Sequence, residues 1–168
     1  MALRTIRELG DPVLTKKCKE ITSVSPRITM LAEDLLDTMY EADGVGLAAP
    51  QVGILKRIVV VDIGDENDPN SPYILTNPEV VETSGEQTDY EGCLSYPGKY
   101  GKVTRPDHAK VKAFNLDMEP IVVEADGLLA RAFLHEIDHL EGIMFVEHVE
   151  GDIVSAEDLA ADTEDDED

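Results

Sequence analysis

The stretch from Leu128 to Gly142, LLARAFLHEIDHLEG, constrains the fold of this chain most strongly. It contains no proline, and Asp126 before it and Gly142 at its end are residue types found at the two ends of helices. Projection at roughly 100° per residue places its side chains on two opposite faces. One face holds Leu128, Ala132, His135 and His139, and the other holds Leu129, Phe133, Ile137 and Leu140. The pattern predicts a buried helix with an apolar back and two imidazoles in front.

The same stretch contains the sequence His135-Glu136-Ile137-Asp138-His139. Two histidines four residues apart lie about one turn apart on a helix, so both rings can face one transition-metal ion. Glu136 lies about 100° round the helix from His135, where it stays outside the coordination shell and still reaches a water on the ion. Two histidines on a surface helix with a purely structural role are the alternative, and the glutamate between them favours the metal site.

The charge of the chain is negative and uneven. The net charge is −22 over 168 residues. Ten of the 36 acidic residues and none of the 14 basic residues lie at Glu150 or beyond, so residues 1–149 carry 26 acids against 14 bases, a net charge of −12. An acidic body disfavours a phosphate backbone as partner, so we expect no direct nucleic-acid binding. We predict one catalytic domain in residues 1–150 and a largely disordered acidic tail in residues 151–168, with a short helix over 155–161.

Cysteine use and hydropathy indicate a cytoplasmic protein. The two cysteines, Cys18 and Cys93, make no disulfide framework, although one pair is not excluded. No apolar run approaches the length of a membrane span, and the first ten residues lack the apolar centre of a signal peptide. We therefore expect a reducing compartment and no membrane partner.

The remaining pattern predicts an α+β fold with antiparallel sheet. Ser25 and Pro26 are typical of a helix start, and Asp43-Gly44 ends the helical spacing that follows. β-branched runs then indicate strands over residues 57–63, 73–83 and 109–125, the last a hairpin that turns near residues 117–120. Strands grouped between two helices favour the α+β class.

The segment from Gly44 to Gly53, GVGLAAPQVG, has side chains too small to fill a core. Such a segment allows another backbone to approach closely. Gln51 is its only polar side chain, and its amide can donate to an oxyanion. A tight connection between a strand and a loop explains the segment equally well.

A metal site on the helix needs a third ligand, and Cys93 is the best donor available. Cys93 precedes a Pro-Gly turn, which predicts an exposed bend, although a free cysteine is more often a small buried apolar residue. The protease pattern HExxHxxGxxH fails because Phe145 occupies its last position. Glu157 lies in the polar tail, and His148 lies at no familiar spacing. The thiolate of Cys93 is a strong ligand for Zn²⁺ or Fe²⁺.

Three segments, GVGLAAPQ, EGCLS and HEIDH, resemble the three motifs of the peptide deformylases in order and separation. The resemblance implies antiparallel β-sheets packed around a central metal-binding helix, with one N-terminal helix. It implies a hydrolase that removes the N-formyl group from the initiator methionine of nascent peptides, in transient proximity to the ribosome. It also implies one divalent ion, Fe²⁺ in the native state, with Zn²⁺, Ni²⁺ or Co²⁺ able to replace it.

The resemblance assigns roles by position. The metal ligands correspond to Cys93, His135 and His139. Glu136 matches the general base and acid, which takes a proton from water and returns it to the departing amine. Gln51 and the backbone N–H of Leu94 match the donors to the oxyanion.

The resemblance also implies the surroundings of the substrate. Val45 and Gly46 match the segment that pairs with the substrate backbone. Glu91 and Arg105 match a pair that orients the ligands. We place Val45, Gly46, Glu91 and Arg131 around the substrate.

Two residues depart from the family pattern. Leu134 stands where the family usually has glutamine, and we expect only a packing change there. Arg131 lies one turn before His135, where the family commonly has an apolar residue near the methionine pocket. We expect its guanidinium to extend to solvent. The alternative is an altered pocket, with weaker preference for formyl-Met over formyl-Asp or formyl-Glu.

Two other functions remain open from the sequence. One is a metallopeptidase of the HExxH type, and the other is a degenerate relative that binds metal without catalysis. The tail after Glu150 has the wrong charge to dock on RNA.

Overall fold

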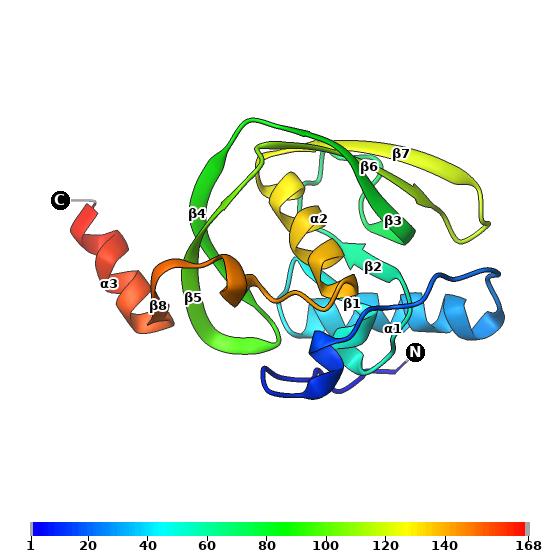
Figure 1. Ribbon diagram of the computed structural model, residues 1–168, viewed down its shortest axis with the longest axis horizontal. Coiled ribbons are helices and arrows are strands. Elements are labelled where there is room, and N and C mark those ends of the chain that lie inside the picture. Colours follow the sequence, from blue (N-terminus) through cyan, green and yellow to red (C-terminus); the bar gives the residue numbers. More distant parts are fainter. Residues whose placement is uncertain (1, 167–168) are drawn as a thin grey trace.

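Two antiparallel sheets with one helix between them form the frame of the molecule (Figure 1). The computed structural model describes residues 2–166, with side chains as far as residue 161. The first sheet has the strand order β1-β2-β3-β6-β7, formed by β1 (Gly46–Ala48), β2 (Ile58–Val61), β3 (Tyr73–Ser84), β6 (His108–Phe114) and β7 (Pro120–Asp126). The second has the order β4-β5-β8, formed by β4 (Gln87–Cys93), β5 (Tyr96–Arg105) and β8 (Glu150–Ser155). The helix between them is α2 (Gly127–Leu140), and the predicted α+β class is confirmed.

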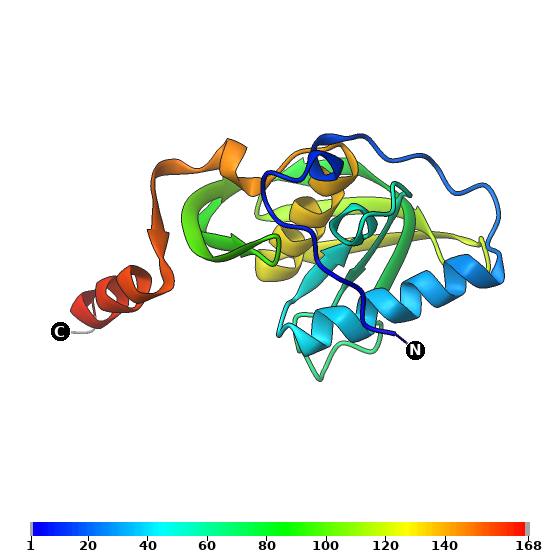
Figure 2. The ribbon, with the colours of Figure 1, turned by 90° about the horizontal axis from the view of Figure 1, so that it is seen from below.

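The N-terminal helix α1 (Pro26–Glu41) packs on the β1–β2 end of the first sheet (Figure 2). It begins at Pro26, whose missing N–H is not needed in the first turn of a helix. Its buried residues recur at helical spacing and include Ile28, Leu31, Leu35 and Met39. They share a core cluster with Ile58 and Val60 of β2. The helix predicted from Ser25 onward is therefore confirmed.

Strand β2 is buried on both faces. Val59 and Val61 point away from α1 and belong to the cluster that contains Phe133 and Ile137 of α2. A strand covered by helices on both sides shows an unbroken apolar run instead of alternation, which explains the sequence Ile58–Val61. The apolar back predicted for α2 is thus packed on the first sheet.

The C-terminal end of α2 lies against the chain near residue 15. Gly142 adopts φ 76°, the left-handed conformation expected for the residue after a helix. A Cβ at Gly142 would lie 2.5 Å from the carbonyl oxygen of Thr15. The backbone N–H of Cys18 donates to the carbonyl of Leu140 at 2.9 Å. The N-terminal segment therefore crosses the helix end in close contact.

The hairpin of β4 and β5 was not predicted as strands. Its sequence contains Pro97, Gly98 and Gly101 and few β-branched residues, so intrinsic propensity gives a weak signal. The pairing comes from tertiary context, with Glu91 opposite Gly101 in register. The predicted bend is the two-residue turn at 94–95, whereas Cys93 ends β4 and is half-buried.

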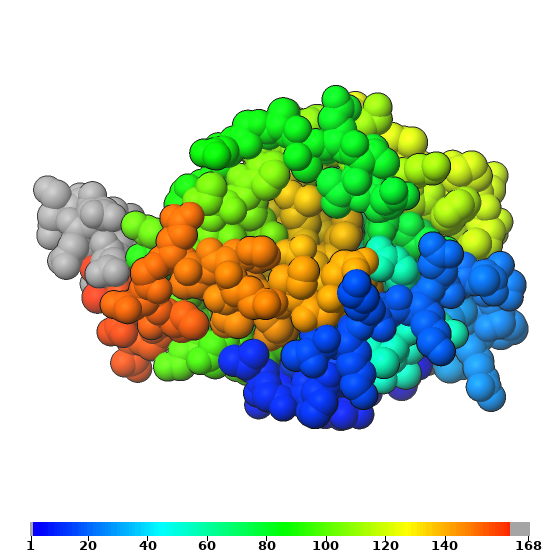
Figure 3. All heavy atoms as spheres, in the orientation of Figure 1, coloured from blue at the N-terminus to red at the C-terminus, as the bar shows by residue number. Residues whose placement is uncertain are grey.

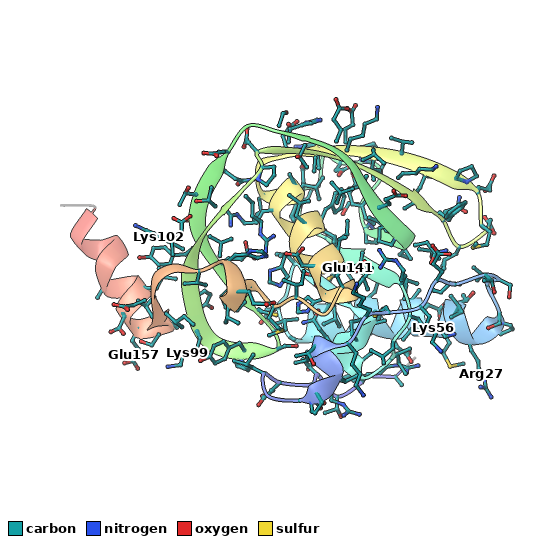
Figure 4. The ribbon with its side chains drawn as sticks, in the orientation of Figure 1. Arg27, Lys56, Lys99, Lys102, Glu141 and Glu157 are labelled. Carbon is teal, nitrogen blue, oxygen red and sulfur yellow. The ribbon has the colours of Figure 1, made fainter. Side chains whose placement is uncertain are left out.

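The C-terminal segment extends the second sheet and then leaves the body of the molecule. Strand β8 pairs with β5, with Lys99 opposite Ser155, and helix α3 (Ala156–Asp166) points away from the core (Figures 1 and 2). Figure 4 shows Lys99 and Lys102 on the part of β5 beside β8, and Glu157 at the start of α3. Strand β8 was not expected, and α3 runs past the short helix predicted over 155–161. The domain division at residue 150 and the disorder of the tail in solution stay predictions. None of the helices in residues 2–166 is long and apolar enough to span a membrane.

Asp34 of α1 holds the first residues of the chain. Its carboxylate, 2% exposed, accepts from the backbone N–H of Ala2 at 2.9 Å and from Nε of Arg4 at 3.0 Å. Burial alone would raise the pKa of Asp34, but the hydrogen bonds from Ala2 and Arg4 outweigh it and lower the pKa below 3.8. A carboxylate whose pKa is lower in the folded state stabilises the fold above its unfolded pKa. The contribution is lost as pH falls through the folded pKa.

Asp34→Asn is expected to lower the free energy of unfolding by about 1–3 kcal/mol at pH 7, because hydrogen bonds to a charged acceptor are lost. The difference from the wild type should be smaller at about pH 3, below the unfolded-state pKa of an aspartate, where the charged carboxylate contributes less to stability. Urea unfolding at both pH values measures this. Glu33→Gln, at an exposed site on the same helix, should change stability by less than about 0.5 kcal/mol. An equal loss for Asp34→Asn at both pH values would contradict the charge-based explanation.

Candidate metal centre

Three metal-binding donors converge at the front of α2. Cys93 comes from the end of β4, and His135 and His139 come from α2. One donor atom from each lies within 4.8 Å of the others, and Sγ of Cys93 is 3.3 Å from Nε2 of His139. In the space-filling view, α2 lies in the middle of the visible face, bordered by residues of β3 and by the segment after residue 142 (Figure 3). The sulfur of Cys93 and the two imidazoles, which the sequence predicted to converge, thus lie within 4.8 Å of one another.

The chemistry of these donors fits one divalent ion. Cysteine with two histidines is a ligand set found in metal sites that keep one position for water. Burial, with nearby positive charge from His135 and Arg105, holds the pKa of His139 well below its usual value, so the ring is neutral as a ligand must be. Oε1 of Glu136 is buried without a hydrogen-bond partner among the described residues, as is Nδ1 of His139, although that nitrogen points away from the sulfur that Nε2 faces. Unpaired buried atoms of this kind point to an ion or water beside them.

Glu136 lies beside the donors in a buried position. Burial raises the pKa of its carboxyl to about 7, and the Glu91 carboxylate adds to the rise against the opposing charge of His135. Gly46 of β1 passes so close that a Cβ there would lie 2.4 Å from Oε2 of Glu136. Only glycine leaves room for this carboxylate. The sequence predicted the close approach of another backbone to this segment, whereas the neighbour of Gly46 in the structure is the side chain of Glu136.

Gln51 presents an amide on the Cys93 side of the site. It is 1% exposed and lies in a short 3₁₀ helix, Ala49–Val52. Its Oε1 accepts from the backbone N–H of Ala48 at 2.9 Å, which turns Nε2 toward Ser95 Oγ at 3.1 Å and Cys93 Sγ at 3.5 Å. The amide is thus held as a donor next to the ligand sulfur. Leu94, in the turn after Cys93, also lines the cavity described below.

A cavity of about 660 Å³ opens in front of the donors. Its walls include Val45 and Gly46 on one side and Tyr90 and Gly92 on the other. These residues belong to or adjoin β1 and β4, each at an edge of its sheet. A free strand edge offers backbone groups to an extended peptide. Leu128, predicted on the front of α2, is 53% exposed at the cavity.

Behind the donors, the carboxylate of Glu91 receives four hydrogen bonds. Oε1 accepts from Nη2 of Arg105 at 2.7 Å and from Nδ1 of His135. Oε2 accepts from Nε of Arg105 at 2.8 Å and from Nη1 of Arg131 at 2.7 Å. Burial would raise the pKa of Glu91, but the hydrogen bonds from Arg105 and His135 outweigh it and hold the pKa well below its usual value. Glu91 therefore stays ionised and fixes the ring of His135.

The expectation that Arg131 extends to solvent is wrong. Arg131 is 5% exposed, and besides Glu91 it contacts the backbone carbonyl of Gln87, with Nη2 at 3.3 Å. The buried carboxylate of Glu91 holds the guanidinium in the interior, because separating the pair would leave a buried charge without a partner. Leu134, the other departure, is 9% exposed in the apolar core, which agrees with the expected packing change.

His148, left open as a ligand by the sequence, lies away from the three donors. Its Nε2 contacts Oδ2 of Asp138 at 3.1 Å, and the same oxygen accepts from Nη1 of Arg105 at 3.0 Å. Cys93, His135 and His139 form the only group of three possible ligands found among the side chains of residues 2–161. The link from Asp138 to Arg105 was missed, although Asp138 lies inside the HEIDH segment.

Comparison with known proteins agrees with this geometry. The model of the family described as polypeptide deformylase matches residues 3–152. The chain belongs to the polypeptide deformylase family. A peptide deformylase from Lachnoclostridium phytofermentans is 60% identical over 153 residues, covering 91% of this chain and 93% of the relative. Another from Agathobacter rectalis is 58% identical over 151 residues, covering 90% and 92%.

Solved structures of the family share the fold. The crystal structure of peptide deformylase from Thermotoga maritima superposes with a TM-score of 0.84 at 39% identity, over 90% of this chain and all of that chain (100%). A peptide deformylase from Synechococcus elongatus, in complex with actinonin, gives a TM-score of 0.81 at 41% identity, over 87% of this chain and 78% of that chain. The family predicted from the three motifs is therefore confirmed.

Proposed function

We propose that this chain is a metal-dependent hydrolase that removes the N-formyl group from the N-terminal methionine of newly made polypeptides and releases formate. The observation that carries the proposal is the meeting of Cys93, His135 and His139 within 4.8 Å, beside the buried carboxylate of Glu136. Membership of the deformylase family supports the choice of substrate.

The three donors would hold one divalent ion. We propose Fe²⁺ as the native ion, with Zn²⁺, Ni²⁺ or Co²⁺ as substitutes, because thiolate and imidazole ligands suit all of them. Such an ion, when bound, supplies Lewis-acid polarisation and lowers the pKa of a coordinated water toward neutrality. Glu91 orients His135 toward the ion by accepting its Nδ1 proton.

The protein side chains then move protons and stabilise charge. Glu136 accepts a proton from the attacking water and returns it to the departing amine. A pKa of about 7 suits both transfers near neutral pH. The amide of Gln51 and the backbone N–H of Leu94 donate to the formyl oxygen as it becomes negative. Each donor would be worth about 3 kcal/mol of barrier.

The substrate peptide would lie in the cavity as an added strand. Val45 and Gly46, at the edge strand β1, would pair with its backbone. We propose nascent peptides in the cytoplasm as the substrate, met in transient proximity to the ribosome and without direct binding to nucleic acid or membrane. The acidic tail has no assigned part in this reaction.

The proposal is tested by anaerobic purification, metal analysis and a formate assay with formyl-Met-Ala-Ser. We expect one divalent ion per chain and formate released in step with the free amine. Cleavage of a peptide bond in unformylated Met-Ala-Ser would instead support the metallopeptidase alternative. Bound metal with neither activity would support a degenerate relative. The family match disfavours both alternatives.

Gly46→Ala is expected to lower kcat for formate release by about 10- to 100-fold, because the added methyl displaces the Glu136 carboxylate by an ångström or more. Metal content should stay at the wild-type value, because the nearest atoms that a Cβ at Gly46 would meet belong to Glu136 and to none of the three donors. Gly98→Ala tests for a general glycine effect, because a Cβ there meets no atom within 4 Å, although φ is 73°. Wild-type turnover in Gly46→Ala would contradict the role given to this contact.

A further inference from the structure

The ligands of the candidate centre come from two separately built parts of the molecule. Cys93 ends a strand of the second sheet, whereas His135 and His139 lie on a helix whose apolar back packs on the first sheet. The distance between the sulfur and the rings therefore depends on what joins α2 to the β4–β5 hairpin. Side-chain bonds to Glu91 of β4 make that connection.

We infer that Arg131 is a positioning residue, which holds the Glu91 carboxylate so that His135 is aimed at the ion, and that it does not bind the substrate side chain. The inference rests on the proposed function for its catalytic meaning. Its structural content concerns Arg131, Glu91 and His135 alone.

The hydrogen bonds of Glu91 show why one arginine is insufficient. Each carboxylate oxygen accepts two donors, and Arg131 supplies the second donor to Oε2. Arg105 is shared, because its Nη1 is bound to Asp138 while Nε and Nη2 hold Glu91. Without Arg131, the only remaining donor to Oε2 of Glu91 is Nε of Arg105, a guanidinium that also binds Asp138. The carboxylate is then held from one side alone, by the fork of Arg105, and a tilt of that pair would carry the His135 ring with it.

Both terminal nitrogens of the Arg131 guanidinium have a hydrogen-bond acceptor. Nη1 binds Glu91, and Nη2 lies 3.3 Å from the carbonyl oxygen of Gln87, which precedes Glu91 by four residues on β4. The side chain is 5% exposed, although it lines the cavity. Since its charged end is directed at β4, the part of Arg131 toward the cavity is its apolar stem. A formyl-Asp or formyl-Glu substrate would find the charge of Arg131 already paired with Glu91.

Arg57 provides a matched control. It also joins a carboxylate to a backbone carbonyl, with Nη1 at 2.7 Å from Glu141 and Nη2 at 2.9 Å from the carbonyl of Pro78. Glu141 caps the far end of α2 (Figure 4). Arg57→Met therefore loosens an anchor of the same helix without touching Glu91.

The experiment compares wild type, Arg131→Met, Arg131→Lys and Arg57→Met, each loaded with Co²⁺ alone. Release of Co²⁺ to a chelator and the visible Co²⁺–thiolate bands are measured, with the thermal midpoint as a check on folding. We expect Arg131→Met to release Co²⁺ about 10- to 100-fold faster and to shift the bands. Arg131→Lys, which keeps one donor to Glu91, should recover part of the loss. Arg57→Met should release Co²⁺ within about twofold of wild type even if its midpoint falls.

Two results would overturn the inference. The first is release from Arg131→Met at the wild-type rate with unchanged bands. The second is a tenfold or larger change, in Arg131→Met, of the kcat/KM ratio between formyl-Met and formyl-Glu peptides, which would place the guanidinium in contact with substrate. If wild type released no formate, the proposed function would fail, whereas the Co²⁺ measurements would still decide the role of Arg131.

Discussion

Cys93→Ala is expected to remove both the ion and the activity. In the proposed centre Cys93 is the one ligand from the second sheet, and without it two imidazoles on one helix would remain to hold the ion. Metal analysis after exposure to a chelator should find wild type still loaded and Cys93→Ala empty. Formate release should fall to background with the metal. The substitution also removes the sulfur that contacts Gln51 Nε2, so re-addition of excess metal should restore only part of the activity.

Cys18→Ser is the matched control, because Cys18 is the other cysteine of the chain and is also half-buried. Burial raises the pKa of the Cys18 thiol to about 11, so it is protonated at neutral pH and does not compete as a ligand. Cys18→Ser should keep its metal and its turnover. Full metal content in Cys93→Ala would show that the sulfur of Cys93 is not a ligand, and the proposed ligand set would then be wrong.

Glu136→Gln is expected to lower kcat for formate release by about 10²- to 10⁴-fold, the usual contribution of a general acid–base group. Glutamine keeps the shape of the side chain beside Gly46 but accepts no proton, so the loss should appear in kcat with little change in KM. Metal content should remain at one ion per chain, because Glu136 is not among the three converging donors. Metal analysis and formate release on the same samples check both statements.

The control for this prediction is Glu141→Gln. Glu141 lies just beyond α2 and contacts Arg57 at its surface. Its turnover should stay within about twofold of wild type, since this partly exposed ion pair contributes little and lies outside the cavity and the three donors. A similar kcat in Glu136→Gln and wild type would require another base, and none of the three donors could fill that role while holding an ion.

The parts of the site fixed by local pattern could be predicted from the sequence. Helical spacing alone put His135 and His139 on one face of α2 and Phe133 and Ile137 on the other, and the structure has them so. The need for a third ligand, joined to the EGCLS motif, identified Cys93. The helical part succeeded because helix geometry relates residues three and four apart whatever surrounds them, whereas the role of Cys93 as a ligand stays a prediction.

The parts that depend on pairing over long sequence separations could not be predicted. Arg131 meets Glu91 across 40 residues, and its sequence neighbourhood suggested a solvent-exposed cation. Strands β4 and β5 form although glycine and proline weaken their propensity, because each provides the other with a partner. In both cases the deciding contact lies in another element of the fold.

The close passage of Gly142 over Thr15 determines where the histidine-bearing helix stops. A residue with a side chain at position 142 would meet both an unfavourable φ and the Thr15 carbonyl. The helix, which ends at Leu140, is therefore followed by a fixed position only three residues after His139. A slip of one residue along its axis would turn each imidazole by about 100° and carry it about 1.5 Å forward. The angular setting of both rings thus depends on a contact between Thr15 and Gly142, neither of which lines the cavity.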